Sequence, residues 1–239
     1  MKFIKILNLV SQNLLLTRSF MSMVKAYNKN CEFVSDEKLQ KMFNRVSRQY
    51  KSHTQNYLQD NNELNTLFFF ATTTLASTLF TLQGNFESAL KTIDYFLDTT
   101  GGSKLDKKNL SDLKALWTIN ELRRLVILKD KNGLIPEVRQ ELELLKPKVL
   151  SLHTPTFSHL GEQALYYLTI GDAKEATRLL IERANRAGLQ RLNEEIYDNR
   201  GLVTSPTGQD FMKLVQEVRA QLEHQPQKKL THKTFGKSN

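Results

Sequence analysis

Cysteine, proline and glycine are all scarce in this chain of 239 residues, which contains one Cys, five Pro and ten Gly. The single cysteine, Cys31, excludes a disulfide scaffold, a cysteine-rich zinc site and a CxxC redox motif. The small numbers of proline and glycine, with an apolar content of 40%, exclude a collagen-like or low-complexity chain. The length allows one or two domains with a sizeable buried core. A mostly globular protein is therefore expected.

The net charge of +9 lies entirely at the two ends of the chain. Residues 1–31 contain five Lys or Arg and no acid, and residues 225–239 contain four Lys and no acid. Residues 32–224 contain 25 basic and 25 acidic residues, so their net charge is zero. The total charge is therefore no evidence for a basic, nucleic-acid-binding face on the body. Instead it predicts three segments: a basic start, a neutral globular domain and a basic, disordered tail.

The first segment, residues 1–31, has the features of an organellar targeting sequence. Seven apolar residues fall on one broad arc of a helical wheel, with Lys2 and Lys5 opposite, and no acid occurs. The apolar residues are Phe3, Ile4, Ile6, Leu7, Val10, Leu14 and Leu15. The polar stretch 11–13 interrupts the apolar run that a secretory signal requires, and residues 18–20 resemble the Arg-x-aromatic context of mitochondrial cleavage sites. We expect a mitochondrial protein of the matrix, with an ordinary N-terminal helix of a cytosolic protein as the alternative.

Apolar residues recur every three to four positions through most of residues 32–224, and this spacing predicts helices. We expect helices over about 35–59, 63–82, 86–97, 110–127, 136–149, 156–169, 172–187, 189–197 and 211–222. The clearest loops are 99–103 and 201–208, and residues 129–133 are expected to close the fourth helix. No segment longer than four residues alternates with enrichment in β-branched residues, so a sheet is not expected. The predicted fold class is all-α.

One of these helices crosses an uncharged stretch that is long enough to span a membrane. Leu64 to Phe86 comprises 23 residues without a formal charge. Nearly half of them are Thr, Ser, Asn or Gln, so insertion into a bilayer would gain little. We expect this helix to be buried among other helices and not to span a membrane, whereas association with the inner membrane stays open.

Two segments share one residue pattern, in which an aromatic residue stands four positions before a glycine and an alanine five positions after it. The first set is Phe80, Gly84 and Ala89, and the second is Tyr167, Gly171 and Ala176. A small residue precedes each glycine by seven, and an aliphatic residue follows each alanine by four. Small side chains let two antiparallel helices approach closely, the aromatic ring fills the space between them, and glycine permits the tight turn. The pattern predicts two helical hairpins.

These hairpins resemble the tetratricopeptide repeat, a helix–turn–helix unit of about 34 residues. The same turn and alanine also occur in pentatricopeptide repeats. Thr73 and Leu160 stand where the tetratricopeptide family has a tryptophan, and the two glycines are 87 positions apart, which is not a multiple of the repeat length. The resemblance implies a right-handed solenoid of helical hairpins, and the alternative is an irregular helical bundle.

Catalytic, cofactor and metal motifs are not found in the sequence. The five histidines form neither HxxxH nor HExxH, and His153 and His159 are expected in surface or capping positions. Residues 100–104 lack the spacing of a phosphate-binding loop. The acidic pairs Glu141 with Glu143 and Glu194 with Glu195 are expected on solvated helix faces. We therefore predict a protein that is not an enzyme and has no cofactor.

Basic clusters are the remaining candidates for partner or RNA contacts. One contains Arg123 and Arg124, with Lys129 and Lys131 nearby. Another follows one helix face, and a third occupies the tail. The helix-face residues are Lys174, Arg178 and Arg186, and the tail residues are Lys228, Lys229, Lys233 and Lys237. Arg178, Glu182 and Arg186 equally fit an intrahelical ladder of ion pairs.

These features lead to two functional hypotheses. The first is a non-enzymatic mitochondrial helical-repeat factor in organellar gene expression, which binds RNA or the mitochondrial ribosome during mRNA maturation or translation. The presequence-like start, the repeat-like hairpins and the basic tail favour it, and the step to gene expression rests on family analogy. The alternative is a protein-binding scaffold, such as a respiratory-complex assembly factor or a co-chaperone, and the neutral body favours it.

Overall fold

The computed structural model describes residues 36–102, 105–154 and 157–224. The predicted targeting segment and the basic tail lie outside these residues. The described part contains nine α-helices and one short 3-10 helix. They are α2 (Asp36–Gln59), α3 (Glu63–Leu82), α4 (Phe86–Thr100), α5 (Lys107–Asn132), α6 (Pro136–Leu150), α7 (Leu160–Thr169), α8 (Ala173–Ala187), α9 (Gln190–Asp198), η1 (Arg200–Leu202) and α10 (Pro206–Glu223).

The all-α prediction is confirmed. Strand pairing within the described residues is confined to a two-residue antiparallel hairpin between α6 and α7, in which β1 (His153–Thr154) pairs with β2 (Phe157–Ser158). This hairpin is too short to form a layer of the fold. Helices alone therefore build the core.

Most predicted helices lie where the apolar spacing places them, but several predicted loops are shorter in the structure. α5 continues to Asn132, so residues 129–132 do not close it; Lys129 and Lys131 stand in its last turn, where basic residues favour the helix C-terminus. α10 begins at Pro206, inside the predicted loop 201–208, because the Ser205 side chain caps it by accepting from the Gly208 amide at 3.0 Å. α4 extends to Thr100.

α7 begins later than predicted. The β1–β2 hairpin occupies the chain before it, so the helix starts at Leu160 and not near residue 156. His159 stands at the N-cap of α7, but its side chain makes no capping hydrogen bond. The expected capping role of His159 is therefore wrong.

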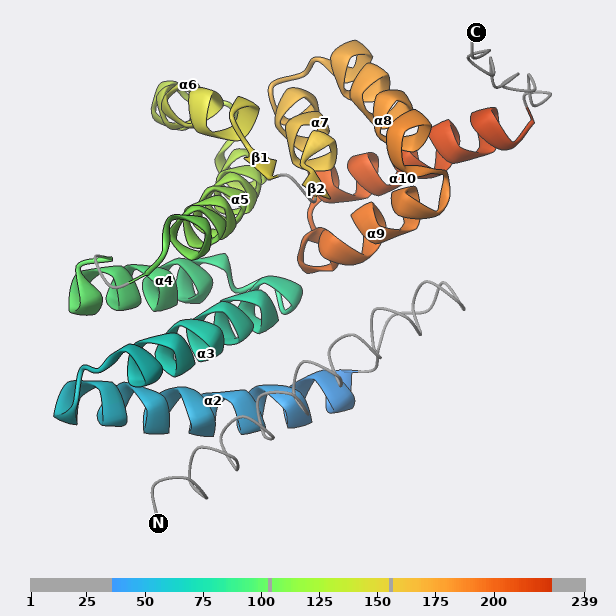
Figure 1. Cartoon of the computed structure of the whole chain (residues 1–239). Helices are drawn as coiled ribbons and strands as arrows, with labels where there is room; N and C mark the ends of the chain where they lie inside the picture. The colour runs from blue at the N-terminus through green and yellow to red at the C-terminus, as the bar shows by residue number, and fades with distance from the viewer. Residues whose placement is uncertain (1–35, 103–104, 155–156, 225–239) are drawn as a thin grey trace, which may run out of the picture.

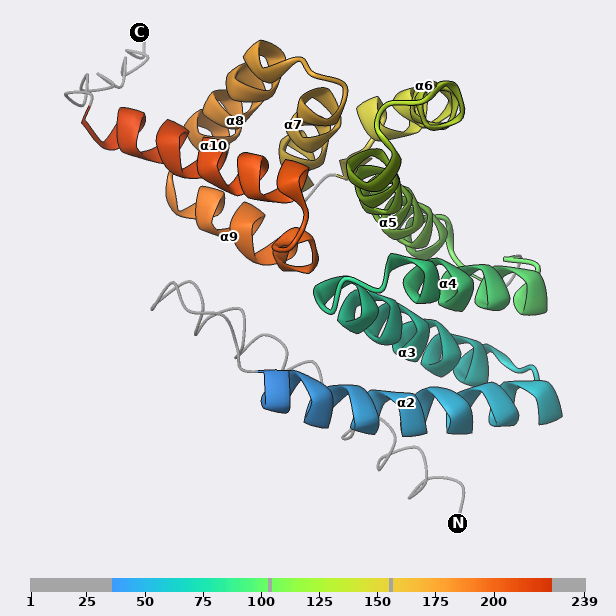
Figure 2. The same ribbon diagram turned by 180° about the vertical axis from the view of Figure 1, so that it is seen from behind.

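The helices fall into two groups (Figure 1). From α2 to α6 each helix packs on its predecessor, as in a solenoid. α7, α8, α9 and α10 instead form a bundle in which α10 returns to contact α5, α7, α8 and α9. Figure 2 shows the same grouping from behind. The fold thus combines the two predicted architectures, a solenoid-like start and a bundle at the C-terminal end.

α3 lies between α2 and α4 (Figure 1), and most of its circumference is buried, whereas Leu64 and Leu67 are exposed. Three of its four buried threonines donate their hydroxyl to the carbonyl four residues earlier, as when Thr72 donates to the Phe68 carbonyl at 2.9 Å and Thr81 to the Ser77 carbonyl at 2.9 Å. The buried hydroxyl of Thr73 has no partner among the described residues. This bonding lets a threonine-rich helix enter the core at little cost. None of the described helices is long and apolar enough to cross a membrane.

The two predicted hairpins, α3–α4 and α7–α8, have the same turn. Asn85 donates its amide to the Phe80 carbonyl at 2.9 Å, and Asp172 donates to the Tyr167 carbonyl at 2.8 Å. Both glycines adopt positive φ, 75° at Gly84 and 92° at Gly171. The alanine five positions later is fully buried in both hairpins, as the pattern predicted.

The second helix of each hairpin is also capped in the same way, by Asn85 in the first hairpin and by Asp172 in the second. Asn85 and Asp172 have nearly identical backbone angles, and each side chain accepts from the amide three residues later, at 3.1 and 3.0 Å. The predicted helical hairpins are confirmed. Membership of a repeat family stays a prediction.

Candidate functional site

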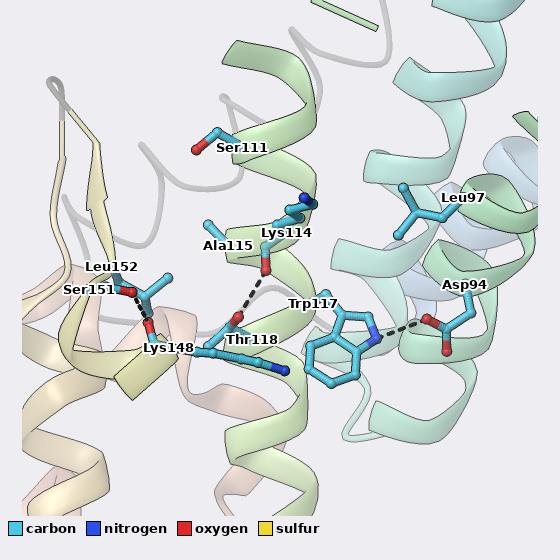
Figure 3. Close-up of a pocket in the computed structure, with 10 residues that line it drawn as sticks. All are labelled: Asp94, Leu97, Ser111, Lys114, Ala115, Trp117, Thr118, Lys148, Ser151 and Leu152. Atoms are coloured by element: carbon cyan, nitrogen blue, oxygen red, sulfur yellow. Dashed lines mark hydrogen bonds between the residues drawn. The ribbon is translucent and has the colours of Figure 1, made fainter. Parts of the chain in front are cut away.

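An open groove lies where α4, α5 and α6 meet (Figure 3), and it encloses about 500 Å³. α4 and α5 are adjacent because a short connection joins them, and the Asp106 side chain starts α5 by accepting from the Asn109 amide at 2.7 Å. α6 follows after another short turn, with Pro136 in its first helical turn. The groove is lined by Asp94, Leu97, Ser111, Lys114, Ala115, Trp117, Thr118, Lys148, Ser151 and Leu152.

Trp117, the only tryptophan of the chain, is held in one orientation at this groove. Its indole Nε1 donates to the Asp94 carboxylate at 2.9 Å, and the Lys148 ammonium lies 4.9 Å from the ring centroid (Figure 3). A cation over an indole face is favourable by about 0.5–1 kcal/mol at an exposed site. Burial raises the pKa of Asp94, while the hydrogen bond from Trp117 acts to lower it. The contact at the ring nitrogen and the contact at the ring face therefore hold the tryptophan in one orientation.

The groove has an apolar surface and a polar rim that carries both positive and negative charges. Leu97, Ala115 and Leu152 supply apolar surface, and the rim carries the exposed lysines Lys114 and Lys148. Asp94 places one carboxylate on the opposite wall, on α4. Such a surface can hold an apolar side chain while the ammonium groups bind carboxylates. It offers no nucleophile paired with a base, so no chemical step is indicated.

Arg123 was expected in an exposed basic cluster, and the structure overturns this. Its side chain is only 4% exposed, and its Nε donates to the Asn199 side chain at 3.1 Å. The neighbouring Arg124 is partly buried, and it binds the Glu121 carboxylate through two nitrogens at 2.8 and 2.7 Å and also pairs with Glu141. The hydrogen bonds to Glu121 raise the pKa of Arg124. Hydropathy cannot distinguish these adjacent arginines, because their burial depends on α9 and α6.

The basic residues of α8 form the predicted ladder of ion pairs. Arg178 pairs with Glu175 at 2.6 Å and with Glu182 at 2.9 Å, and Arg186 also pairs with Glu182. The acids compensate these arginine charges along the exposed face. Lys174 is exposed in the first turn of the same helix. The tail lysines Lys228, Lys229, Lys233 and Lys237 lie outside the described residues.

A second group of charged side chains is buried between the two groups of helices. Arg183 of α8 donates its Nε to the Glu195 carboxylate of α9 at 2.7 Å, and both residues are buried. The prediction that Glu195 lies on a solvated face is therefore wrong. Glu162 lies close to His159, with the Nδ1–Oε2 distance at 3.6 Å. The sequence signal for its burial is that Glu195 follows the apolar Leu192 by three positions, which places both on one face of α9.

The groove at Trp117 was likewise not identified from the sequence. Lys114 and Trp117 stand three positions apart on one helix face, which is a local signal. Asp94 and Lys148 reach the ring only because α4 and α6 pack on opposite sides of it, and no local pattern predicts that. The described residues contain no group of three or more His, Cys, Asp or Glu side chains that could hold a metal ion.

Comparisons with protein-family models, with curated proteins and with solved structures found no match.

Proposed function

We propose that this protein is a non-enzymatic mitochondrial scaffold of helical hairpins that binds an acidic segment of a partner polypeptide in the Trp117 groove. The observation that supports this is the fixed orientation of Trp117 between Asp94 and Lys148 at the edge of an open, partly apolar groove. Tryptophan is enriched at the centres of protein interfaces because a rigid ring buries a large area at low entropic cost. A ring that is already oriented loses little freedom on binding.

The charge of the rim selects the chemistry of the partner. Lys114 and Lys148 are exposed, and each can bind a carboxylate of the partner at one end of the groove. An apolar side chain of the partner would pack on Leu97 and Leu152 between them. Contacts of this kind join a desolvated centre to a charged rim, as protein interfaces do.

A protein partner is favoured over RNA for the body of the molecule. Residues 32–224 have no net charge, and the ion pairs of Arg124, Arg178 and Arg186 leave little uncompensated positive charge on their faces. Phosphate binding depends on such uncompensated lysines and arginines. The body therefore suits a polypeptide better than a polynucleotide.

The basic tail supports a second candidate function. Residues 225–239 contain four lysines and no acid, which suits RNA or the mitochondrial ribosome during mRNA maturation or translation. Binding of this kind weakens steeply with salt. RNA crosslinking at two salt concentrations, with and without residues 225–239, tests it. Loss of the crosslink with the tail is expected, whereas a salt-insensitive crosslink would contradict it.

Photocrosslinking tests the groove directly. A photoreactive benzoylphenylalanine at Ser111, an exposed groove residue, is expected to capture a protease-sensitive partner in native cells. The double variant Lys114→Glu, Lys148→Glu should lose the product. The matched control Lys51→Glu, Lys174→Glu makes the same charge change at exposed lysines outside the groove, and it should keep the product. A nuclease-sensitive product, or equal loss in both variants, would overturn the proposal.

A further inference from the structure

A second cavity, of about 240 Å³, lies between α3 and α5 on one side and α7, α8 and α9 on the other. It shares no lining residue with the Trp117 groove. It is lined by Thr78, Thr81, Leu82, Leu116, Ile119, Arg123, His159, Glu162, Arg183, Glu195 and Asp198. Its walls come from the two groups of helices, so a molecule bound there would contact both.

The two sides of this cavity differ in chemistry. Leu82 of α3 and Leu116 and Ile119 of α5 give the N-terminal side apolar surface, beside Thr78 and Thr81, whose hydroxyls donate to carbonyls of α3. The charged side chains are those of Arg123 on α5, Glu162 on α7, Arg183 on α8, and Glu195 and Asp198 on α9. The cavity is therefore amphipathic, with one apolar end and one end that carries both signs of charge.

Some of these charged groups already have partners, and others keep free hydrogen-bonding capacity. Arg183 is bound to Glu195, and Glu162 lies against His159. Arg123 is buried, and among the described residues only its Nε donates a hydrogen bond, so its four terminal N–H groups remain available. The Nε2 of His159 is buried without a partner in the described part of the chain. A buried polar group without a partner is costly unless a ligand or water satisfies it.

The mixture of charges favours a ligand that is itself a zwitterion. A simple anion at Arg123 would be repelled by the nearby acids Glu162 and Asp198, whose charges act on this arginine. A simple cation would be repelled by the two guanidinium groups. A molecule that carries one charge of each sign and no net charge meets neither penalty.

We propose that this cavity binds a small zwitterion, an aliphatic α-amino acid. Its carboxylate accepts hydrogen bonds from the terminal nitrogens of Arg123, and its ammonium group binds Asp198. Its side chain packs against Leu82, Leu116 and Ile119, which line the other end of the cavity.

The size of the cavity agrees with this class of ligand. Pockets for drug-sized molecules enclose about 300–1,000 Å³, and this cavity lies below that range. A nucleotide or a folded partner segment would not fit in it.

The test measures thermal unfolding and calorimetric binding of the full chain with four matched compounds. L-leucine carries both charges and an apolar side chain; 4-methylpentanoate lacks the ammonium group, 3-methylbutylamine lacks the carboxylate, and glycine lacks the side chain. Only leucine is expected to raise the unfolding temperature with a saturable dose dependence. An unchanged temperature with leucine, or an equal rise with 4-methylpentanoate, would overturn the proposal.

A matched pair of variants separates the site from general effects. Asp198→Asn removes the ammonium partner at an exposed position, so the protein should fold and bind leucine about tenfold or more weakly. Asp210→Asn makes the same change at an exposed position of α10, away from the cavity, and this variant should bind leucine normally. Equal affinity in both variants would contradict the assigned contact.

Discussion

At the scale of single residues, Gly161 shows how closely the buried charges are packed. A Cβ atom at this position of α7 would lie 1.7 Å from the Oε2 atom of Glu195. The Glu195 carboxylate therefore rests on the bare backbone of α7 while it accepts from Arg183. Any larger residue at position 161 would therefore require the Glu195 carboxylate to move.

We predict that Gly161→Ala lowers the free energy of unfolding by about 1–3 kcal/mol, the range for overpacking a core. The added methyl group must displace the Glu195 carboxylate from Arg183. Chemical denaturation measures the change. In a Glu195→Ala background the same substitution should cost much less, because the space is free. Equal costs in the two backgrounds would contradict the packing described.

The ionisation of Glu195 gives the protein a pH dependence. Burial first, and then the Glu162 charge, raise the pKa of Glu195 from 4.5 to about 8, against the lowering effect of Arg183. The groups that face it are Glu162 from α7, Arg183 from α8, Arg123 from α5, Asp198 from α9 and His159 before α7. Between pH 4.5 and about 8, the folded protein therefore keeps a proton on Glu195 that the unfolded chain has lost.

The free energy of unfolding should therefore fall as the pH rises from 5 to 8, because the unfolded state binds fewer protons there. One proton gives a slope of up to about 1.4 kcal/mol per pH unit. Burial also raises the pKa of Asp198, to about 7, so Asp198 adds to the slope below that pH. Glu195→Gln keeps a hydrogen-bonding side chain and should remove the part of the slope that is due to Glu195. Denaturation at constant ionic strength across the range measures it, and an unchanged slope in the variant would refute the assignment.

At the scale of elements, the two similar hairpins differ in what their turns contact. The turn glycines Gly84 and Gly171 both have positive φ, but only Gly84 is enclosed. A Cβ at Gly84 would lie 2.8 Å from the Gly201 carbonyl oxygen, whereas a Cβ at Gly171 meets nothing within 4 Å. The first turn therefore also joins α3 to the η1 segment.

This pair offers a matched test. Alanine at either position costs about 1–2 kcal/mol for the left-handed backbone. Gly84→Ala should cost at least about 1 kcal/mol more than Gly171→Ala, because it also overpacks against Gly201. Denaturant titration of the two variants measures the difference. Equal losses would mean that the Gly84 turn is not packed on η1.

The sequence predicts elements of this protein better than it predicts their contacts. Local signals suffice for α3, whose predicted bounds 63–82 agree with Glu63–Leu82, and for the shared turn of the hairpins. They fail at Arg123 and Glu195, whose charged side chains are typical of a surface. Their burial depends on helices that pack far along the chain, and a single sequence carries no pairing signal for that. The Trp117 groove was missed for the same reason.

At the scale of the whole molecule, the sequence combines a body without net charge, residues 32–224, with basic ends. The presequence-like features of residues 1–31 predict removal of the segment near residue 20 on import into mitochondria. Mass spectrometry of the N-terminus of the native protein tests this. A mature chain that begins near Met21 would agree with mitochondrial import, and a retained Met1 on the native protein would contradict it.

Because Trp117 is the only tryptophan, its ring can report on the groove alone. The most direct test is the ¹⁹F NMR spectrum of the protein labelled with 5-fluorotryptophan, recorded with and without unlabelled native cell extract. If a partner binds in the groove, the single resonance shifts or broadens with extract in the unmodified protein but not in the Lys114→Glu, Lys148→Glu variant. A resonance that extract leaves unchanged, or changes equally in both proteins, would contradict binding of a partner in the groove.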